Sequence, residues 1–189
     1  VVTVTGQNEH APDIAGGASS SASIPENTTL AYSPSASDAD IGVGGSQTWS
    51  IAGGADSSRF TIDASTGALS FLTAPDYEIA VDAGNNNVYD VTIQVSDGTL
   101  TDTQSVAVTV TNGNEAPQFT SFAGASSAAT GVVENTTSVA TLSATDVDAG
   151  TTLTYSIAGG IDGPQFTINT STGVLSFKTA PDFEVPHRS

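Results

Sequence analysis

The sequence predicts an all-β protein made of tandem immunoglobulin-like Greek-key β-sandwiches, of which the second is incomplete. Two observations lead to this prediction. One unit occurs twice within the 189 residues, and apolar residues alternate with polar ones at the period of a β-strand. In addition, no window combines helical periodicity with helix-capping residues.

The internal repeat is visible in long matched stretches. FTIDASTGALSFLTAPDYE begins at Phe60, and FTINTSTGVLSFKTAPDFE begins at Phe166. We expect residues 1–11 to be the last strand and linker of a preceding repeat, and residues 12–112 to be a complete repeat. Residues 113–189 are expected to form a second repeat that is truncated at its C-terminal end, because it has no counterpart of residues 79–111.

Strands are predicted where apolar side chains recur at every second position. Residues 89–95 and 106–110 alternate most clearly, and Asp97-Gly98 between them indicates a hairpin. The stretches around Trp49 and Tyr155 match each other, and both are expected to be strands that face the core. About seven strands per complete repeat follow from this pattern.

The composition restricts the class of partner. Twenty Asp and Glu residues against three Lys and Arg give a formal net charge of −17. Nucleic acid and anionic membrane surfaces are disfavoured because both require Lys and Arg, whereas a cation is favoured. The chain has no Cys, so disulfides and thiolate metal sites are excluded. No stretch of 18 apolar residues is present, so direct membrane insertion is not expected.

Acidic residues recur at matched positions in the two copies. If the repeats stack end to end, six of these carboxylates are expected to meet at the junction between them: Glu26, Asp76, Glu78, Glu115, Asp146 and Asp148. Each close pair repels by roughly 1 kcal/mol at about 4 Å in water. Calcium, which accepts about six to eight oxygen ligands, would offset this repulsion better than magnesium or zinc.

Six short motifs, in this order along the chain, resemble those of the cadherin repeat. They are Pro25-Glu26-Asn27, Asp38-Ala39-Asp40, Phe60-Thr61-Ile62-Asp63 with Thr66-Gly67, Asp76-Tyr77-Glu78, Val95-Ser96-Asp97-Gly98 and Asn114-Glu115-Ala116-Pro117. The sequences of these motifs are similar to those of bacterial cadherin-like repeats in large surface proteins and RTX-type adhesins. The resemblance covers essentially the whole chain and implies Ca²⁺ between successive repeats.

The resemblance also implies which residues bind the ions. At the junction between the two copies the ligands would be Glu26, Asp76, Glu78, Asn112, Asn114, Glu115, Asp146 and Asp148. A half-site at the start of the first copy would contain Asn8, Glu9, Asp38, Asp40 and Asp97. A second half-site at the end of the second copy would contain Glu134, Asp182 and Glu184.

The leading interpretation is a calcium-binding module of a bacterial cell-surface or secreted adhesin, located outside the cell. Calcium between repeats would stiffen the chain for cell adhesion or for use as an extender. Its partners would be neighbouring repeats and a cell-surface protein or polysaccharide. The alternatives are a calcium-dependent polysaccharide-binding module and a spacer attached to a secreted enzyme. No nucleophile and base are arranged for catalysis, so the chain itself is not expected to be an enzyme.

A few conspicuous residues receive a structural interpretation. Trp49 is expected in the core, and His10 and His187 are expected on the solvated surface. Asp56 is interpreted as a turn residue. Asp82, with Asn85 to Asn87, is interpreted as a flexible turn, and an ion-binding loop is the alternative.

Overall fold

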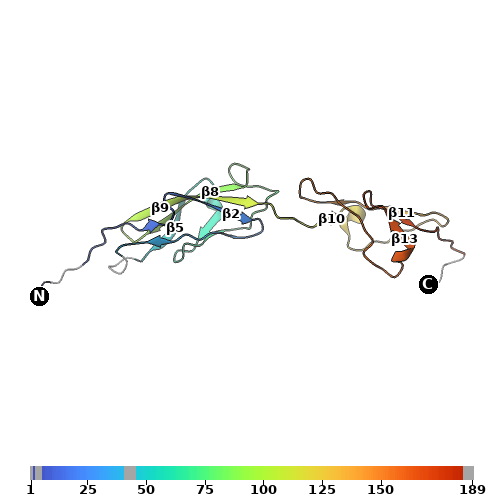
Figure 1. The fold of residues 1–189 in the computed structure, drawn as a ribbon, viewed down its shortest axis with the longest axis horizontal. Coiled ribbons are helices and arrows are strands. Elements are labelled where there is room, and N and C mark those ends of the chain that lie inside the picture. The colour runs from blue at the N-terminus through green and yellow to red at the C-terminus, as the bar shows by residue number, and fades with distance from the viewer. Residues whose placement is uncertain (1, 3–5, 41–45, 185–189) are drawn as a thin grey trace. The chain divides into compact units, whose positions relative to one another are not determined.

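The computed structural model describes residue 2, residues 6–40 and residues 46–184. Within these residues, the regular elements are β-strands and three short 3₁₀ turns, which confirms the all-β prediction. The chain divides into two compact units, residues 1–113 and 114–189 (Figure 1). Residues 1 and 3–5 of the expected preceding strand and linker at 1–11 fall outside the described residues, and so does the C-terminal tail from Val185 onward.

The strands of the first unit are short except for the last two. They are β1 (Asp13–Ile14), β2 (Ser19–Pro25), β3 (Leu30–Tyr32), β4 (Ala36–Ser37), β5 (Thr48–Gly53), β6 (Phe60–Ile62), β7 (Leu69–Phe71), β8 (Val88–Ser96) and β9 (Thr101–Thr111), with the 3₁₀ turn η1 at Ser57–Arg59. The short strands β1 and β4 pair with each other and account for the excess over the expected seven.

Two sheets form the sandwich of the first unit. One contains β2, β9, β8 and β5 in this order, and the other contains β3, β7 and β6. Strands β8 and β9 form an antiparallel hairpin that closes at Ser96 and Thr101, as Asp97-Gly98 predicted. Strand β2 pairs parallel to β9 from Ser19 opposite Ser105 to Pro25 opposite Thr111. The two strands therefore end at the same pole of the unit.

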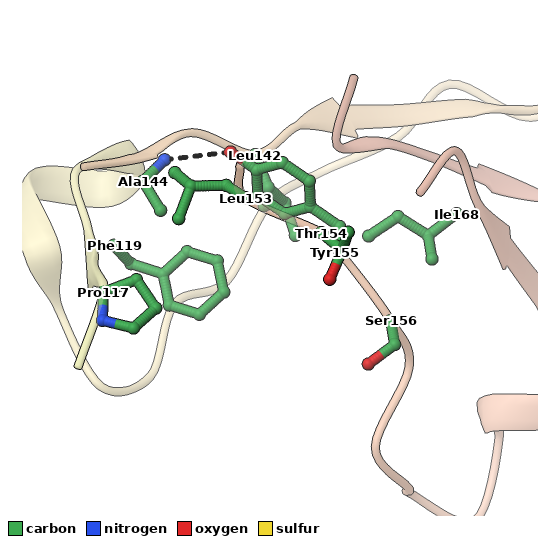
Figure 2. A pocket seen from close by; sticks show the side chains of 9 residues that line it. All are labelled: Pro117, Phe119, Leu142, Ala144, Leu153, Thr154, Tyr155, Ser156 and Ile168. Carbon is green, nitrogen blue, oxygen red and sulfur yellow. Dashed lines mark hydrogen bonds between the residues drawn. The ribbon is translucent and has the colours of Figure 1, made fainter. Parts of the chain in front are cut away.

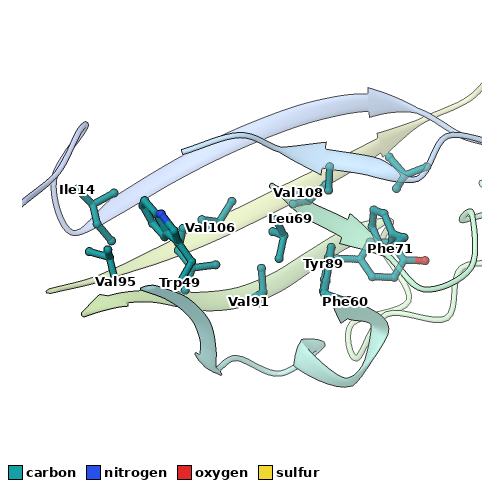
Figure 3. Close-up of a cluster of buried hydrophobic side chains, with 13 residues drawn as sticks. Ile14, Trp49, Phe60, Leu69, Phe71, Tyr89, Val91, Val95, Val106 and Val108 are labelled. Carbon is teal, nitrogen blue, oxygen red and sulfur yellow. The ribbon is translucent and has the colours of Figure 1, made fainter. Parts of the chain in front are cut away.

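The core lies between these sheets, and the predicted alternation places its side chains there (Figure 3). Seven of the thirteen buried hydrophobic residues come from β8 and β9, so this hairpin supplies more than half of the core. The thirteen are Ile14, Ala31, Trp49, Phe60, Leu69, Phe71, Tyr89, Val91, Ile93, Val95, Val106, Val108 and Val110.

Two buried carboxylates organise the connection between β7 and β8. Asp56 stands in the expected turn but is buried, and its oxygens accept hydrogen bonds from the backbone N–H groups of Ala83 and Asp90, at 2.7 and 2.9 Å. Asp82 is also buried and accepts from the N–H groups of Gly84, Asn86 and Asn87. The loop after Asp82 is therefore a turn, as expected, and its backbone is hydrogen-bonded to the Asp82 carboxylate.

The second unit forms only part of a sandwich. Its strands are β10 (Gln118–Phe119), β11 (Ser138–Thr141), β12 (Ala144–Thr145), β13 (Phe166–Ile168) and β14 (Val174–Phe177), with the 3₁₀ turns η2 (Ser121–Gly124) and η3 (Gly163–Gln165). Strands β11, β14 and β13 make one sheet, and β10 pairs with β12.

The strand predicted around Tyr155 is not formed, because residues 151–160 belong to no strand. Its counterpart β5 pairs antiparallel with β8, with Trp49 opposite Val95 and Ile51 opposite Ile93. A strand is defined by its hydrogen-bonded neighbour, and no strand among the described residues pairs with residues 151–160. The predicted strand is therefore not present in the described part of the chain.

No helix among the described residues has the length and apolarity that crossing a lipid bilayer requires.

Replacing Gly67 should destabilise the first unit. Gly67 has φ +74°, and a Cβ atom there would lie 2.8 Å from the Trp49 ring. Backbone strain together with overpacking predicts a loss of about 3 kcal/mol for Gly67→Ala in urea unfolding followed by Trp49 fluorescence. Gly17→Ala is the control, because Gly17 has φ +78° and open space around it. An equal loss in both variants would show that the contact with Trp49 contributes nothing.

The stability of the first unit should depend on pH through Asp82. Burial raises the pKa of this carboxyl, but hydrogen bonds from the N–H groups of Asn86, Asn87 and Gly84 outweigh burial, so the pKa is lowered. A lowered pKa stabilises the fold above the unfolded value of about 3.9, and this stabilisation is lost as the pH falls through that range. Urea unfolding at about pH 6 and about pH 3 should therefore differ less in Asp82→Asn than in wild type.

The control for this measurement is Asp13→Asn, because the Asp13 residue is exposed on β1. It should retain the pH dependence of the wild type. If Asp82→Asn retains it as well, the hydrogen-bonded carboxylate is not its source.

Candidate metal centre

The parallel register of β2 and β9 positions the first carboxylate of the predicted site. Pro25 lies opposite Thr111 at the end of the paired region. The N–H of Glu26 continues the pairing by donating to the Thr111 carbonyl at 3.0 Å. The residues that follow each strand, Glu26 and Asn112, therefore emerge at the same pole.

Glu26 is a buried carboxylate that links three segments of the chain. Its exposed fraction is 5%. Oε1 accepts a hydrogen bond from the N–H of Gly113 at 2.7 Å, and Oε2 accepts one from the N–H of Tyr77 at 2.9 Å. The N–H of Asn27 donates to the Pro75 carbonyl at 2.9 Å. These bonds hold the loop after β7 and the segment after β9 against the end of β2.

Two further carboxylates lie beside Glu26. Glu26, Asp76 and Glu78 each place a carboxylate oxygen within 4.8 Å of the others. Asp76 and Glu78 are exposed, and the Asn112 side-chain amide donates to Glu78 Oε1 at 2.8 Å. Three carboxylates at this spacing repel one another. Oxygen atoms of this kind are ligands for a hard divalent cation such as Ca²⁺.

The end of the second unit repeats this arrangement. Glu134, Asp182 and Glu184 also place carboxylate oxygens within 4.8 Å of one another. The N–H of Phe183 donates to Glu134 Oε2 at 3.0 Å, as the N–H of Tyr77 does to Glu26. Glu134 is less buried than Glu26.

The opposite pole of the first unit contains the Asp-Ala-Asp motif. Asp40 Oδ2 accepts hydrogen bonds from the N–H groups of Glu9 and His10, at 2.8 and 2.7 Å. The N–H of Asp40 donates to Asp38 Oδ1 at 2.8 Å. The pKa of Asp40 is lowered, chiefly by the N–H groups of His10 and Glu9. The motif therefore fixes the linker against the first loop of the sandwich.

The second unit uses the same local geometry. Asp148 Oδ2 accepts from the N–H of Glu115 at 2.9 Å, and the N–H of Asp148 donates to Asp146 Oδ1 at 3.0 Å. The Asn114 side-chain amide donates to the Glu115 carbonyl. The eight predicted junction ligands thus fall into two local sets, one in each unit.

Two side-chain oxygens at the N-terminal pole of the first unit lack a hydrogen-bond donor, and such oxygens suit a cation. Asp97 is 6% exposed, and its Oδ1 accepts from the N–H groups of Thr99 and Leu100 at 2.7 Å each. The N–H groups of Leu100 and Thr99 are the main reason why the pKa of Asp97 is lowered. Asp97 Oδ2 and Asn8 Oδ1 are enclosed without a hydrogen bond of good geometry. Such oxygens are costly unless something binds them, and Ca²⁺ would do so.

Two contacts of these poles were not predicted from the sequence. His10 was expected in solvent; its side chain is 64% exposed, but Nδ1 lies 3.1 Å from Asp40 Oδ2. The reason is that the His10 backbone is already bonded to Asp40. The Gly113 N–H that donates to Glu26 was also not predicted. Every residue except proline has a backbone N–H, so the sequence does not indicate which one donates to a given carboxylate. His187 lies outside the described residues.

Comparison with known proteins identifies the first unit. Residues 20–111 match the family model of the cadherin domain. Residues 20–111 therefore form a cadherin-like domain. It is 33% identical over 195 residues to human protocadherin Fat 4 and 30% identical to rat cadherin-23, and 97% and 98% of the chain are covered. The chain spans only 4% and 6% of the length of these two relatives.

Solved structures agree on the fold. A structure of human protocadherin-24 EC1-2 has a TM-score of 0.59 and 23% identity, and the match covers 93% of this chain and 81% of that one. A structure of mouse cadherin-23 EC22-24 has a TM-score of 0.54 and 20% identity, and the match covers 93% of this chain and 56% of that one. The predicted cadherin-like β-sandwich fold is therefore confirmed.

Glu26→Gln should destabilise the first unit in metal-free buffer. The side-chain amide of Gln offers one oxygen, so one of the N–H groups of Gly113 and Tyr77 would face an NH₂ group. The expected loss is about 1–3 kcal/mol in urea unfolding, with faster amide hydrogen exchange at Gly113 and Tyr77. Asp76→Asn is the control, because Asp76 is exposed and its one backbone bond, from Ile79, needs a single oxygen. Equal losses would contradict the role given to Glu26.

Proposed function

We propose that this chain is a calcium-binding cadherin-like module, in which Ca²⁺ at the poles of successive repeats stiffens an extracellular chain used for adhesion or as an extender. The observation that supports this best is the carboxylate cluster of Glu26, Asp76 and Glu78, repeated at Glu134, Asp182 and Glu184. The three carboxylates occupy matched positions in the two copies and have the same spacing in both.

The proposed ligands are those that the resemblance implied. At the junction of the two repeats they are Glu26, Asp76, Glu78, Asn112, Asn114, Glu115, Asp146 and Asp148. The half-sites at the outer poles are Asn8, Glu9, Asp38, Asp40 and Asp97 for the first unit, and Glu134, Asp182 and Glu184 for the second. Carboxylates of this number attract a divalent cation and lose their mutual repulsion when it binds.

The protein context is part of the proposal. Fat 4 and cadherin-23 are mammalian proteins, and the location on a bacterial surface stays a prediction. Neighbouring repeats are the proposed partners, together with a cell-surface protein or polysaccharide. Trp49 is 5% exposed, so the single tryptophan is in the core and is not a platform for a sugar ring. This burial favours the spacer and adhesion role over carbohydrate binding.

Calcium should raise the thermal stability of the chain. A ligand that binds only the folded state at 100 times its dissociation constant adds about 2.7 kcal/mol. For a domain of this size, 1 kcal/mol corresponds to about 4–8 °C in Tm. We therefore expect an increase of several degrees at millimolar Ca²⁺ relative to EGTA, measured by calorimetry, and a smaller increase with Mg²⁺.

The matched variants separate site binding from general screening of charge. The double variant Asp76→Asn with Glu78→Gln should lose most of the calcium effect on the first unit. Asp90→Asn removes an exposed carboxylate on β8, outside the clusters, and should retain the effect. If Ca²⁺ changes neither the Tm nor the small-angle scattering, or if all variants respond as the wild type does, the proposal is wrong.

A further inference from the structure

The segment after β9 contains the one Asn-Gly pair of the sequence, Asn112-Gly113. In this dipeptide the backbone nitrogen of the second residue can readily attack the asparagine side chain, because glycine has no side chain to crowd the approach. Asn112 is exposed and lies outside the strand, since β9 ends at Thr111. Its carboxamide is therefore accessible at the pole of the first unit.

Two carboxylates contact the atoms that would react. The Gly113 N–H donates to Glu26 Oε1 at 2.7 Å, and Asn112 Nδ2 donates to Glu78 Oε1 at 2.8 Å. A base that removes a proton has to lie about 2.6–3.2 Å from the donor atom. Glu26 meets this condition for the attacking nitrogen, and Glu78 lies against the nitrogen that would leave.

The chemical nature of the acceptor distinguishes this N–H from most others. A buried backbone N–H usually donates to a backbone carbonyl, which is too weak a base to take the proton. A carboxylate can take it. Glu26 is 5% exposed, and a second hydrogen bond from the Tyr77 N–H holds its Oε2. The contact that organises the pole therefore also presents a base to the Gly113 nitrogen.

We propose that Asn112 modifies itself, so that its carboxamide becomes a carboxylate at the proposed metal-binding pole. Glu26 takes the proton of the Gly113 N–H while the nitrogen forms a bond to Cγ of Asn112. The Cγ–Nδ2 bond then breaks, and the amide group takes up the proton and leaves as ammonia, which gives a cyclic succinimide. Water opens this ring to aspartate, or to isoaspartate when it adds at the other carbonyl. The reaction consumes water, releases ammonia and needs no oxidant or reductant.

Either product changes the charge beside Glu78. The amide donor that lies 2.8 Å from Glu78 Oε1 is replaced by a carboxylate. Glu26, Asp76 and Glu78 already place oxygens within 4.8 Å of one another, so a further negative charge increases their repulsion. A divalent cation relieves this repulsion, and the modified pole should bind Ca²⁺ more tightly. This consequence rests on the proposed function, whereas the reaction itself needs no metal.

Other asparagines have a base of the same kind but no glycine after them. The N–H groups of Asn87, which follows Asn86, and of Glu115, which follows Asn114, each donate to an aspartate carboxylate at 2.9 Å. In both cases a side chain on the attacking residue crowds the nitrogen. Asn86 and Asn114 are therefore internal controls that test the requirement for glycine.

The pocket of the second unit offers no comparable chemistry. It has a volume of about 260 Å³, and none of the residues that line it is an Asp, Glu, His, Lys or Asn. Figure 2 shows Phe119, Leu153 and Tyr155 around it, and the Tyr155 hydroxyl accepts a hydrogen bond from the Ala144 N–H at 3.1 Å. The reactive pair thus lies at the pole of the first unit and not in this pocket.

The test follows deamidation of the full chain in EGTA at physiological pH and temperature. Peptide mapping by mass spectrometry locates each replacement of NH₂ by OH, and chromatography separates aspartate from isoaspartate. Asn112 should convert well ahead of Asn86 and Asn114, and at least as fast as in the synthetic peptide Thr111–Pro117, which lacks Glu26. Conversion that is slower than in this peptide, or no faster than at Asn86 and Asn114, overturns the proposal.

Gly113→Ala should slow the reaction at least about tenfold, because the methyl group crowds the attacking nitrogen. Circular dichroism checks that this variant is folded. The same substitution in the synthetic peptide gives a second comparison that needs no folding. An unchanged rate in the folded variant or in the peptide contradicts attack by this nitrogen.

The effect on calcium is tested separately with Asn112→Asp, which has the charge of the product, and Asn112→Gln, which keeps an amide. Calorimetric titration should give Asn112→Asp a several-fold lower dissociation constant for Ca²⁺. Equal constants overturn the gain in affinity. Absence of Ca²⁺ binding in every variant contradicts the proposed function as well, whereas the reaction at Asn112 is judged by mass spectrometry alone.

Discussion

The parallel pairing of β2 with β9 is the constraint on which the proposed metal-binding pole depends. It makes two strands that are far apart in sequence end side by side, with Pro25 opposite Thr111. Glu26 is then buried against the Gly113 and Tyr77 N–H groups, which hold the loop that bears Asp76 and Glu78. Without this register, the three carboxylates would belong to unrelated loops.

The protein stabilises its excess negative charge mainly through its own backbone. Three Lys and Arg residues cannot pair with twenty acidic ones. Asp56, Asp82 and Glu26 are instead buried where backbone N–H groups donate to them. At Asp82, hydrogen bonds from the N–H groups of Asn86, Asn87 and Gly84 outweigh burial and lower the pKa of the carboxyl. The exposed Asp76 and Glu78 are left at the pole, where a divalent cation is the natural complement.

The two units show how far one sequence pattern depends on its surroundings. Phe71 and Phe177 occupy matched positions and have matched neighbours in sequence, yet one is buried and the other half-buried. The difference comes from β8 and β9, which supply most of the core of the first unit. Tyr155 has the alternation of a strand residue, but no strand in the described part of the chain pairs with it, so local pattern is necessary for a strand but not sufficient.

Residue order alone was enough to predict the all-β class, the repeat, the β8–β9 hairpin and the acidic motifs, because alternation, turn residues and internal matches are local signals. It also placed Glu26, Asp76 and Glu78 in one predicted cluster through the resemblance to cadherin repeats. The burial of Glu26, the Gly113 and Tyr77 donors and the unpaired stretch at residues 151–160 became visible only with the fold. These features arise from backbone groups brought together across long sequence separations, and every residue type carries the same backbone.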